Sequence, residues 1–253
     1  MIYITGDTHG EFGRRFNSEN FFEQKEMTKD DYVIICGDFG GIWDIYGESK
    51  YEKYWLAWFE ERPYSLLFVD GNHENFDRLN GYKEKEWHGG RVHEIRPHIL
   101  HLMRGQVFEI SGKKIFTFGG ASSHDITGGI LDTEDSDFRR KKTALDREHI
   151  PYRINHLTWW EAELASEEEM EEGRKNLRAH DCTVDYIITH CCATGTQNQI
   201  CGGRHYKADR ETDYLESVKN YTDYSKWFFG HYHDNMKINE KEILLYEQII
   251  RIA

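Results

Sequence analysis

Five short apolar runs, each followed at once by a polar loop, constrain the fold of this chain more than any other feature of its sequence. The runs are rich in β-branched and aromatic side chains. Near-continuous runs of this length predict strands that are buried on both faces of a sheet. The runs cover residues 2–4, 32–36, 66–69, 186–189 and 227–229.

The loops behind these runs carry Asp, Asn and His side chains. In open α/β sheets, ligands bind outside the carboxyl ends of the strands. Strands that deliver polar groups to this edge would therefore build one shared site. The candidate site residues are Asp7, His9, Asp38, Asn72, His73, His190, His231 and His233.

These residue types suit a pair of divalent metal ions about 3.5–4 Å apart. One ligand must then bridge the two ions, and a carboxylate can do so because it has two oxygens with several lone pairs. Asp38 has no ligand-type neighbour close in sequence, which makes it the candidate bridge. Ligation by Asp, His and Asn without Cys favours Mn, Fe(II), Zn or Ni over Ca or Mg.

Other segments predict elements around this site. Ser49 and Glu52 match a capping box and predict a helix from residue 49 to the Arg62-Pro63 pair. One apolar face of that helix is expected to pack in the core. The face consists of Tyr51, Tyr54, Trp55, Trp58 and Phe59.

Two segments outside the five runs predict antiparallel strands. Residues 106–118 have the pattern of a hairpin with its turn at 111–113. Residues 236–252 predict further antiparallel strands, with the polar run 239–242 as the turn. These segments could supply a second sheet.

Residues 126–180 differ in composition from the rest, with 13 acidic and 9 basic side chains. Thr158 and Ser166, each followed three residues later by Glu, are candidate helix starts. Two interpretations stay open, a pair of solvated surface helices or a cap that covers the site and selects substrate.

The ordered set of motifs resembles the calcineurin-like metallophosphoesterase family. The resemblance spans residues 7–233. It implies an α/β fold, a four-layer α/β/β/α sandwich, formed by residues 1–253 as a single domain with a binuclear metal centre. The motifs are Asp7-x-His9, Gly37-Asp38, Gly71-Asn72-His73-Glu74, His190 and Gly230-His231-x-His233.

Carried over by position, the resemblance implies a role for each residue. One divalent ion would be held by Asp7, His9, Asp38 and His233. The other would be held by Asp38, Asn72, His190 and His231. A hydroxide that bridges the ions would attack phosphorus in line. His73 matches the family's non-ligand histidine, which protonates the leaving group, a task that suits imidazole near neutral pH.

Two branches of the family fit this chain poorly. The protein Ser/Thr phosphatases continue the second motif as Gly-Asp-x-x-Asp-Arg-Gly, but here Gly41 and Ile42 replace the Asp that orients the general acid and the Arg that grips phosphate. Purple acid phosphatases need a Tyr where Gly41 stands. The chain looks more like the broad prokaryotic-type phosphoesterases of unassigned substrate, with Asp44 as a candidate to orient His73.

Candidate phosphate-binding and rim residues follow from position alone. Arg78 comes five residues after His73, and the His124-Asp125 pair follows a Gly-Gly turn and is expected near the rim of the site. The other candidate phosphate ligands are Arg14, Arg15 and Arg204.

The balance of charge limits the partners of this chain. With 45 acidic and 32 basic side chains the formal net charge is −13, which argues against a protein that coats nucleic acid and against binding to anionic membranes. Two divalent ions would nevertheless make the pocket locally positive. The expected partner is a small phosphoester; nucleic acid and membrane are not expected.

The start of the chain and its cysteines favour a cytoplasmic protein. Met1 leads directly into an apolar run without a basic segment, and no run approaches the ~18 apolar residues of a membrane span. The five cysteines are irregularly spaced, which is typical of reduced thiols.

Three functions stay open. The leading hypothesis is a metal-dependent phosphoester hydrolase, either a phosphatase or a phosphodiesterase. The alternatives are a nuclease of the same fold, and a metal-binding scaffold without catalysis. The complete set of ligands and the presence of His73 favour the hydrolase, whereas fold alone would not decide.

Overall fold

Two β-sheets form the centre of the molecule. A computed structural model describes residues 1–201 and 206–253, and within them the sheets have seven and six strands. The first sheet, in spatial order, consists of β15 (Ile250–Arg251), β1 (Ile2–Thr5), β2 (Tyr32–Cys36), β3 (Ser65–Val69), β6 (Ile99–Leu102), β5 (Gly90–Arg96) and β4 (Lys83–Trp87). The second consists of β13 (Met236–Lys237), β14 (Glu242–Leu244), β12 (Asp223–Phe229), β11 (Thr183–Thr189), β8 (Lys113–Phe118) and β7 (Gln106–Ile110).

Parallel strands occupy the middle of both sheets. In the first sheet β1, β2, β3 and β6 are parallel neighbours, and in the second β8, β11, β12 and β14 are. Antiparallel strands lie at the edges. The carboxyl ends of the middle strands therefore lie side by side within each sheet, where the sequence predicts the site.

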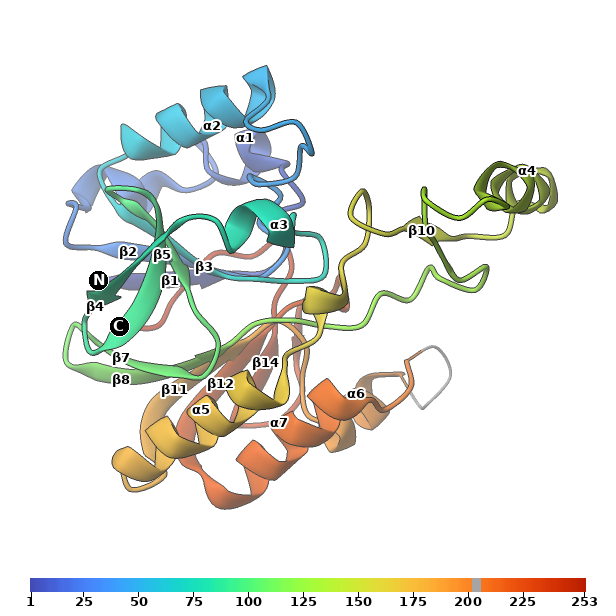
Figure 1. Cartoon of the computed structure of the whole chain (residues 1–253). Coiled ribbons are helices and arrows are strands. Elements are labelled where there is room, and N and C mark those ends of the chain that lie inside the picture. Colours follow the sequence, from blue (N-terminus) through green and yellow to red (C-terminus); the bar gives the residue numbers. More distant parts are fainter. Residues whose placement is uncertain (202–205) are drawn as a thin grey trace.

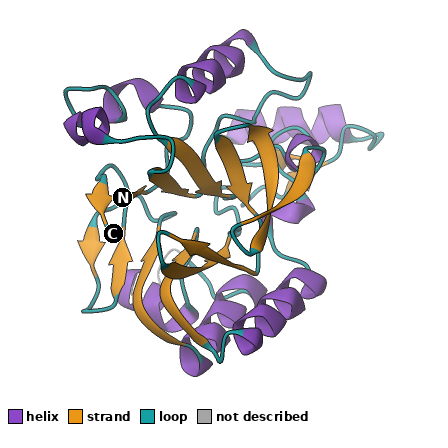
Figure 2. Cartoon of the chain, turned by 90° about the vertical axis from the view of Figure 1, so that its left-hand side faces the viewer, coloured by secondary structure: helices purple, strands orange, loops and turns teal. Residues whose placement is uncertain are grey.

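Helices cover the outer face of each sheet. Figure 1 shows α1 (Phe12–Arg15) and α2 (Lys50–Glu60) above the first sheet, and α5 (Glu167–Ala179), α6 (Thr194–Cys201) and α7 (Arg210–Tyr221) below the second. Figure 2 shows the same order of helix, sheet, sheet and helix from the side. The predicted four-layer α/β/β/α sandwich is confirmed. A 3₁₀ helix (Phe22–Glu26) and the short α3 (Phe76–Leu79) complete the N-terminal half.

The alternation of side chains along each strand explains the four layers. In β2, Val33 and Ile35 pack with the helices above the first sheet, whereas Ile34 and Cys36 pack between the two sheets. A third core lies between the second sheet and the helices below it. Because both faces are covered in the middle of the first sheet, β2 and β3 are buried along their whole length, as parallel strands in α/β proteins are.

Helix α2 begins as predicted but buries a different face. The capping box between Ser49 and Glu52 is present. The expectation that all five aromatic residues pack in the core is wrong, because Tyr51 and Tyr54 are exposed while Leu56 and Phe59 are fully buried. The buried positions of α2 are 52, 56 and 59, so its buried face is rotated from the one that the aromatic spacing suggested.

The predicted hairpin at 106–118 is confirmed as β7 and β8, paired antiparallel. Ser111 and Gly112 both have positive φ, the signature of a type I′ turn. The C-terminal prediction is wrong in part, because β14 pairs in parallel with β12 while β15 joins the first sheet beside β1. Residues 236–251 are thus shared between the sheets.

Residues 126–160 form an excursion away from the sandwich. It contains β9 (Ile130–Leu131), α4 (Phe138–Glu148) and β10 (Arg153–Ile154), and Figure 1 shows α4 held clear of the other layers. No residue of α4 is buried. Among the described residues, no helix has both the length and the apolar composition that a membrane span requires.

The two predicted helix starts in this segment have different outcomes. Ser166 caps α5 with Glu169 as predicted. Thr158 does not start an α-helix, and a 3₁₀ turn at Glu161–Glu163 follows Trp160 instead. Since α5 buries Met170 and Leu177 against the second sheet, it belongs to the sandwich and not to a cap.

Candidate metal centre

The candidate ligands lie where the two sheets meet at their carboxyl edges. Asp7, Asp38 and Asn72 follow the parallel neighbours β1, β2 and β3. His190 and His231 follow the parallel neighbours β11 and β12. Since the sheets face each other across one core, the two sets of loops approach from opposite sides.

A first group of donors surrounds one point. Asp7, His9, Asp38 and His233 each offer one ligand atom, and these atoms all lie within 4.8 Å of one another. Nε2 of His233 is 2.9 Å from Nε2 of His9 and 3.2 Å from Oδ2 of Asp7. Two donors that share an ion at about 2.1 Å each lie about 3.0–3.4 Å apart. The spacing fits a metal ion.

Asp38 stands between this group and a second one. Its Oδ2 lies 3.6 Å from Nε2 of His9, while its Oδ1 lies 3.4 Å from Nε2 of His190. The same His190 nitrogen is 3.3 Å from Oδ1 of Asn72. The His231 ring lies 4.9 Å from the His190 ring. One carboxylate thus faces two groups of donors, which is the arrangement that a bridging ligand requires.

The backbone is strained at four of the candidate ligands. His9, Asp38, His231 and His233 have φ values of 45°, 49°, 70° and 50°. Such left-handed conformations are uncommon outside glycine and cluster at functional sites. They turn the chain back sharply after each strand, so that the side chains point at the site.

Glycines in the motifs make room for the ligands. A Cβ on Gly71 would lie 2.1 Å from Oδ1 of Asp38, and one on Gly230 would lie 2.0 Å from Oδ1 of Asp7. Each Cβ would also meet backbone, the Asp38 nitrogen at 2.5 Å for Gly71 and the Cys36 carbonyl oxygen at 2.9 Å for Gly230. Steric exclusion of a Cβ therefore explains why glycine precedes Asn72 and His231.

The charges of the site call for cations. Asp7 and Asp38 are buried, and among the described residues no lysine or arginine forms an ion pair with either carboxylate. Burial alone would lower the pKa of His190, but Asp38 and Asp7 raise it well above its ordinary value. A buried charge needs a partner, and divalent ions would take the place of this proton. The donor set therefore fits metal ions.

His73 lies beside the donors without joining them. Its backbone N–H donates to Oδ1 of Asp38 at 2.8 Å, and its ring packs between those of His9 and Trp43. Among the described residues, no side chain forms a hydrogen bond with the His73 imidazole. Asp44, the candidate to orient it, instead accepts from the N–H of Tyr46.

A cavity of about 930 Å³ opens beside the first group of donors. Asp7, His9, His73 and His233 line it, together with three arginines and an aromatic wall. The arginines are Arg14, Arg15 and Arg153, and the apolar lining includes Phe12, Phe21, Phe22, Tyr51 and Ile249. The cavity can thus contact an anionic group and an apolar one at once.

The candidate phosphate ligands have different outcomes. Arg14 and Arg15 line the cavity. Arg78 does not, because its guanidinium donates to Glu52 and to the Asp44 carbonyl beneath α2. Arg204 lies outside the described residues.

Sequence reasoning missed Arg153. It comes from β10 in the excursion, lines the cavity, and forms an ion pair with Asp125 at 2.7 Å. Since it lies in a charged segment without a motif, no signal in the sequence distinguished it from surface arginines.

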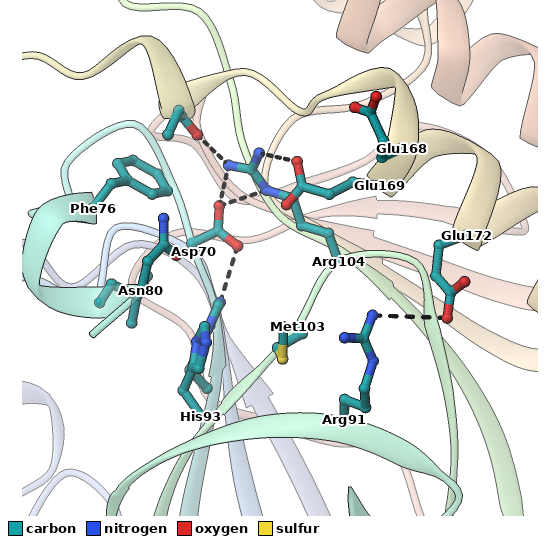
Figure 3. Close-up of a pocket in the computed structure, with 13 residues that line it drawn as sticks. Asp70, Phe76, Asn80, Arg91, His93, Met103, Arg104, Glu168, Glu169 and Glu172 are labelled. Carbon is teal, nitrogen blue, oxygen red and sulfur yellow. Dashed lines mark hydrogen bonds and ion pairs between the residues drawn. The ribbon is translucent and has the colours of Figure 1, made fainter. Parts of the chain in front are cut away.

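A second polar cluster lies behind the Gly71-Asn72-His73 loop. Asp70 accepts hydrogen bonds from Arg104 (Figure 3). Its other oxygen lies 3.0 Å from Nε2 of His101. Arg104 also donates to the carbonyl of Ala162, and Glu169 lies beside it. A cavity of about 490 Å³ adjoins this cluster, which carries its own counter-charge.

Comparison with known proteins agrees with this geometry. The family model described as calcineurin-like phosphoesterase matches residues 1–235. The chain is 28% identical to lariat debranching enzyme A of Xenopus laevis over 142 residues, and 26% identical to lariat debranching enzyme of Danio rerio over 141 residues. Each match covers 51% of this chain but only 25% and 23% of those relatives, so the chain spans about a quarter of their length.

One solved structure is similar over almost the whole chain. The crystal structure of phosphopantetheinyl hydrolase from Mycobacterium tuberculosis covers 97% of this chain and 87% of its own, with 12% identity and a TM-score of 0.47. The fold and the match over residues 1–235 define the class: the chain belongs to the calcineurin-like phosphoesterase family, whose members are metal-dependent hydrolases of phosphoesters.

Proposed function

We propose that this protein hydrolyses phosphoesters at two divalent metal ions, which the two groups of donors around Asp38 would hold. One group is Asp7, His9, Asp38 and His233. The other is Asp38, Asn72, His190 and His231. The position of Asp38, with one oxygen toward each group, is the observation that carries the proposal.

Two ions there would supply a water of lowered pKa and positive charge opposite the phosphoryl oxygens. The protein supplies the rest. His73 lies beside the donors, and among the described residues no side chain forms a hydrogen bond with its imidazole, so it can give a proton to the leaving oxygen. Arg153 and Arg15 line the same cavity and can bind a phosphoryl oxygen.

The donor set favours Mn, Fe(II), Zn or Ni. Imidazole nitrogens form a large share of it, and these ions accept imidazole more readily than Ca or Mg do. Since no cysteine belongs to either group, a thiolate-selective site is not supported.

The proposed substrate is a small phosphoester. The cavity is larger than a phosphate group needs, and its aromatic lining can contact an apolar leaving group. We propose that residues 126–160 serve as a cap within a single-domain protein, because Arg153 brings the excursion to the cavity. The protein is proposed to act in the cytoplasm.

A second candidate is a phosphodiesterase that acts on nucleic acid. The similarity to proteins named lariat debranching enzyme favours it, while the net charge of −13 opposes it. The two candidates share one metal centre and differ in the leaving group.

Metal-stripped protein tests the proposal. Mn, Fe(II), Zn or Ni is returned singly, and hydrolysis of p-nitrophenyl phosphate, its bis ester and a short RNA is compared. We expect metal-restored hydrolysis of at least one of the two nitrophenyl esters. Two bound ions without hydrolysis of any compound would instead support the metal-binding scaffold.

His73→Ala tests the general acid. It should keep both ions and lose activity by about 10²–10⁴-fold on a phenyl ester, whose leaving group needs a proton. The loss should be smaller on p-nitrophenyl esters. Wild-type rates on the phenyl ester would exclude the acid role, and loss of an ion would make His73 a ligand or a structural residue.

A further inference from the structure

The loop that follows β8 lies against the second group of donors. Two neighbouring residues in it, Ser123 and His124, each contact one candidate ligand. We propose that Ser123 and His124 are positioning residues, which fix the Asn72 amide and the His231 imidazole in the orientation that a metal ion requires. The inference rests on the proposed binuclear centre and concerns only its second ion.

Asn72 depends on such a partner because the two ends of an amide differ. The amide oxygen can bind an ion, whereas the NH₂ group is a donor. In the structure Oδ1 lies 3.3 Å from Nε2 of His190, within the donor group, while Nδ2 donates to Oγ of Ser123 at 3.4 Å. A reversed amide would turn its NH₂ group toward the ion.

Glu163 fixes the direction of the hydrogen bond between Ser123 and Asn72. Oγ of Ser123 donates its single proton to Oε2 of Glu163 at 2.6 Å, and the Ser123 N–H donates to Oε1 at 2.8 Å. With its proton engaged, the hydroxyl can only accept from Asn72. An amide oxygen in that place would face lone pairs without a hydrogen, so the Asn72 oxygen is kept on the metal side.

The position of Glu163 in the fold connects the loop after β8 to the returning end of the excursion. Glu163 is buried in the 3₁₀ turn where the excursion returns to the sandwich. Arg104 donates to the carbonyls of Ala162 and Glu163, which holds that turn in place. Asn72 is therefore supported from a segment about 90 residues further along the chain, which no motif contains.

His124 fixes His231 in a similar way. The two Nε2 atoms are 2.6 Å apart, and the ring centroids are 4.7 Å apart. Because this contact occupies Nε2 of His231, Nδ1 is the nitrogen left for an ion. A metal-bound histidine usually donates its other N–H to a fixed acceptor, and the loss of such an acceptor weakens metal binding about 10–100-fold.

Ser122 offers a matched control for Ser123. It lies in the same loop and its hydroxyl also donates to a carboxylate, that of Asp209, but it contacts no candidate ligand among the described residues. Ser122→Ala and Ser123→Ala thus remove the same group from adjacent positions. Ser123→Thr keeps a hydroxyl and serves as the rescue.

Calorimetric titration of metal-stripped protein with Mn²⁺ measures the two binding steps separately, and the EPR signal of coupled Mn²⁺ ions reports the pair. Ser123→Ala should weaken the second step about 10–100-fold and leave the first within about twofold. Ser122→Ala and Ser123→Thr should match the wild type. If Ser123→Ala does not fold, Ser123→Cys, a weak donor and acceptor of similar volume, gives the same comparison.

His124→Phe keeps an aromatic ring at this position and removes both ring nitrogens. It should also weaken the second step, yet bind two ions at saturation. A stoichiometry of one would make His124 a ligand and overturn the positioning role. Wild-type affinity in Ser123→Ala, or equal weakening of both steps, would overturn the role of Ser123. Failure of the proposed binuclear centre would differ from both, because the wild type itself would then bind fewer than two ions, and failure of the proposed hydrolysis would show as two bound ions in the wild type without activity.

Discussion

An aspartate follows each of three neighbouring parallel strands within two residues, yet two of these carboxylates differ from the third in their partners. Asp7 and Asp38, after β1 and β2, face imidazoles and lack a lysine or arginine partner among the described residues. Asp70, after β3, is paired with Arg104 (Figure 3) and with His101. All three are almost fully buried.

The difference shows what makes a buried carboxylate a metal ligand. Burial alone would raise the pKa of Asp70, but Arg104 and His101 hold it well below its ordinary value. That charge is compensated by the chain itself. Around Asp7 and Asp38 the chain supplies imidazoles in place of a lysine or arginine, and divalent ions would replace the proton that the two carboxylates hold on His190.

The largest expected effect comes from a substitution in the cluster around Asp7 and Asp38. Asp38→Asn keeps the size of the side chain but removes the charge and the second strong oxygen ligand. Activity should fall at least about 10³-fold, with both ions bound more weakly. Steady-state hydrolysis and calorimetric metal titration measure these two losses.

Asp70→Asn is the control for Asp38→Asn, since it makes the same change after the neighbouring strand. It should bind two ions with little change in affinity. Loss of metal binding in both variants alike would contradict the distinction between the clusters.

The second prediction concerns the cluster around Asp70. Arg104→Met leaves Asp70 buried without its guanidinium, which should lower the free energy of unfolding by about 3–5 kcal/mol. Urea denaturation measures this. Adding Asp70→Asn should recover part of the loss, because the uncompensated charge is then gone. A single variant within about 1 kcal/mol of the wild type would show that Arg104 is not the needed partner.

The third prediction separates the clusters by their response to metal. Ions that bind only the folded protein, at about 100 times their dissociation constant, stabilise it by about 3 kcal/mol per site. Removing metal should therefore lower the Tm of the wild type by several degrees, as measured by calorimetry. Asp38→Asn should show a smaller decrease, whereas Asp70→Asn should keep the full one.

The sequence predicts the carboxyl-edge cluster well because local patterns determine it. Each apolar run predicts a strand, and in a parallel sheet the residues that follow neighbouring strands must meet, which places Asp7, Asp38 and Asn72 together. His190 and His231 come from the second sheet, and the resemblance to a family was needed to bring the two halves face to face.

The contacts between distant segments could not be predicted. Arg78 is next to the site in sequence, but its guanidinium forms an ion pair with Glu52 on α2. Arg153 and Glu163 reach the site because of the path of the excursion, which has no periodic pattern to fix it. Tyr51 and Tyr54 matched an apolar helical face but lie outside the contact of α2 with the sheet.

Glu211 is a buried carboxyl group that is neutralised in a third way, by keeping its proton. It is fully buried, accepts one backbone N–H from Ala165, and forms no ion pair within the described part of the chain. Burial raises its pKa to about 8, although the positive charge of Arg104 opposes the shift. In the folded protein Glu211 therefore holds a proton at neutral pH.

Stability should consequently fall as pH rises between the ordinary pKa of a glutamate and about 8. In that window the folded protein keeps the Glu211 proton that the unfolded chain has lost, so rising pH favours unfolding, by up to about 1.4 kcal/mol for each pH unit. Glu211→Gln should match the wild type near pH 4.5 and exceed it increasingly toward pH 8, as measured by urea unfolding across this range. Glu19→Gln, at an exposed position, should show no such divergence. A constant difference between Glu211→Gln and the wild type at every pH would mean that Glu211 is ionised in the fold, and that Arg104 compensates it as it does Asp70.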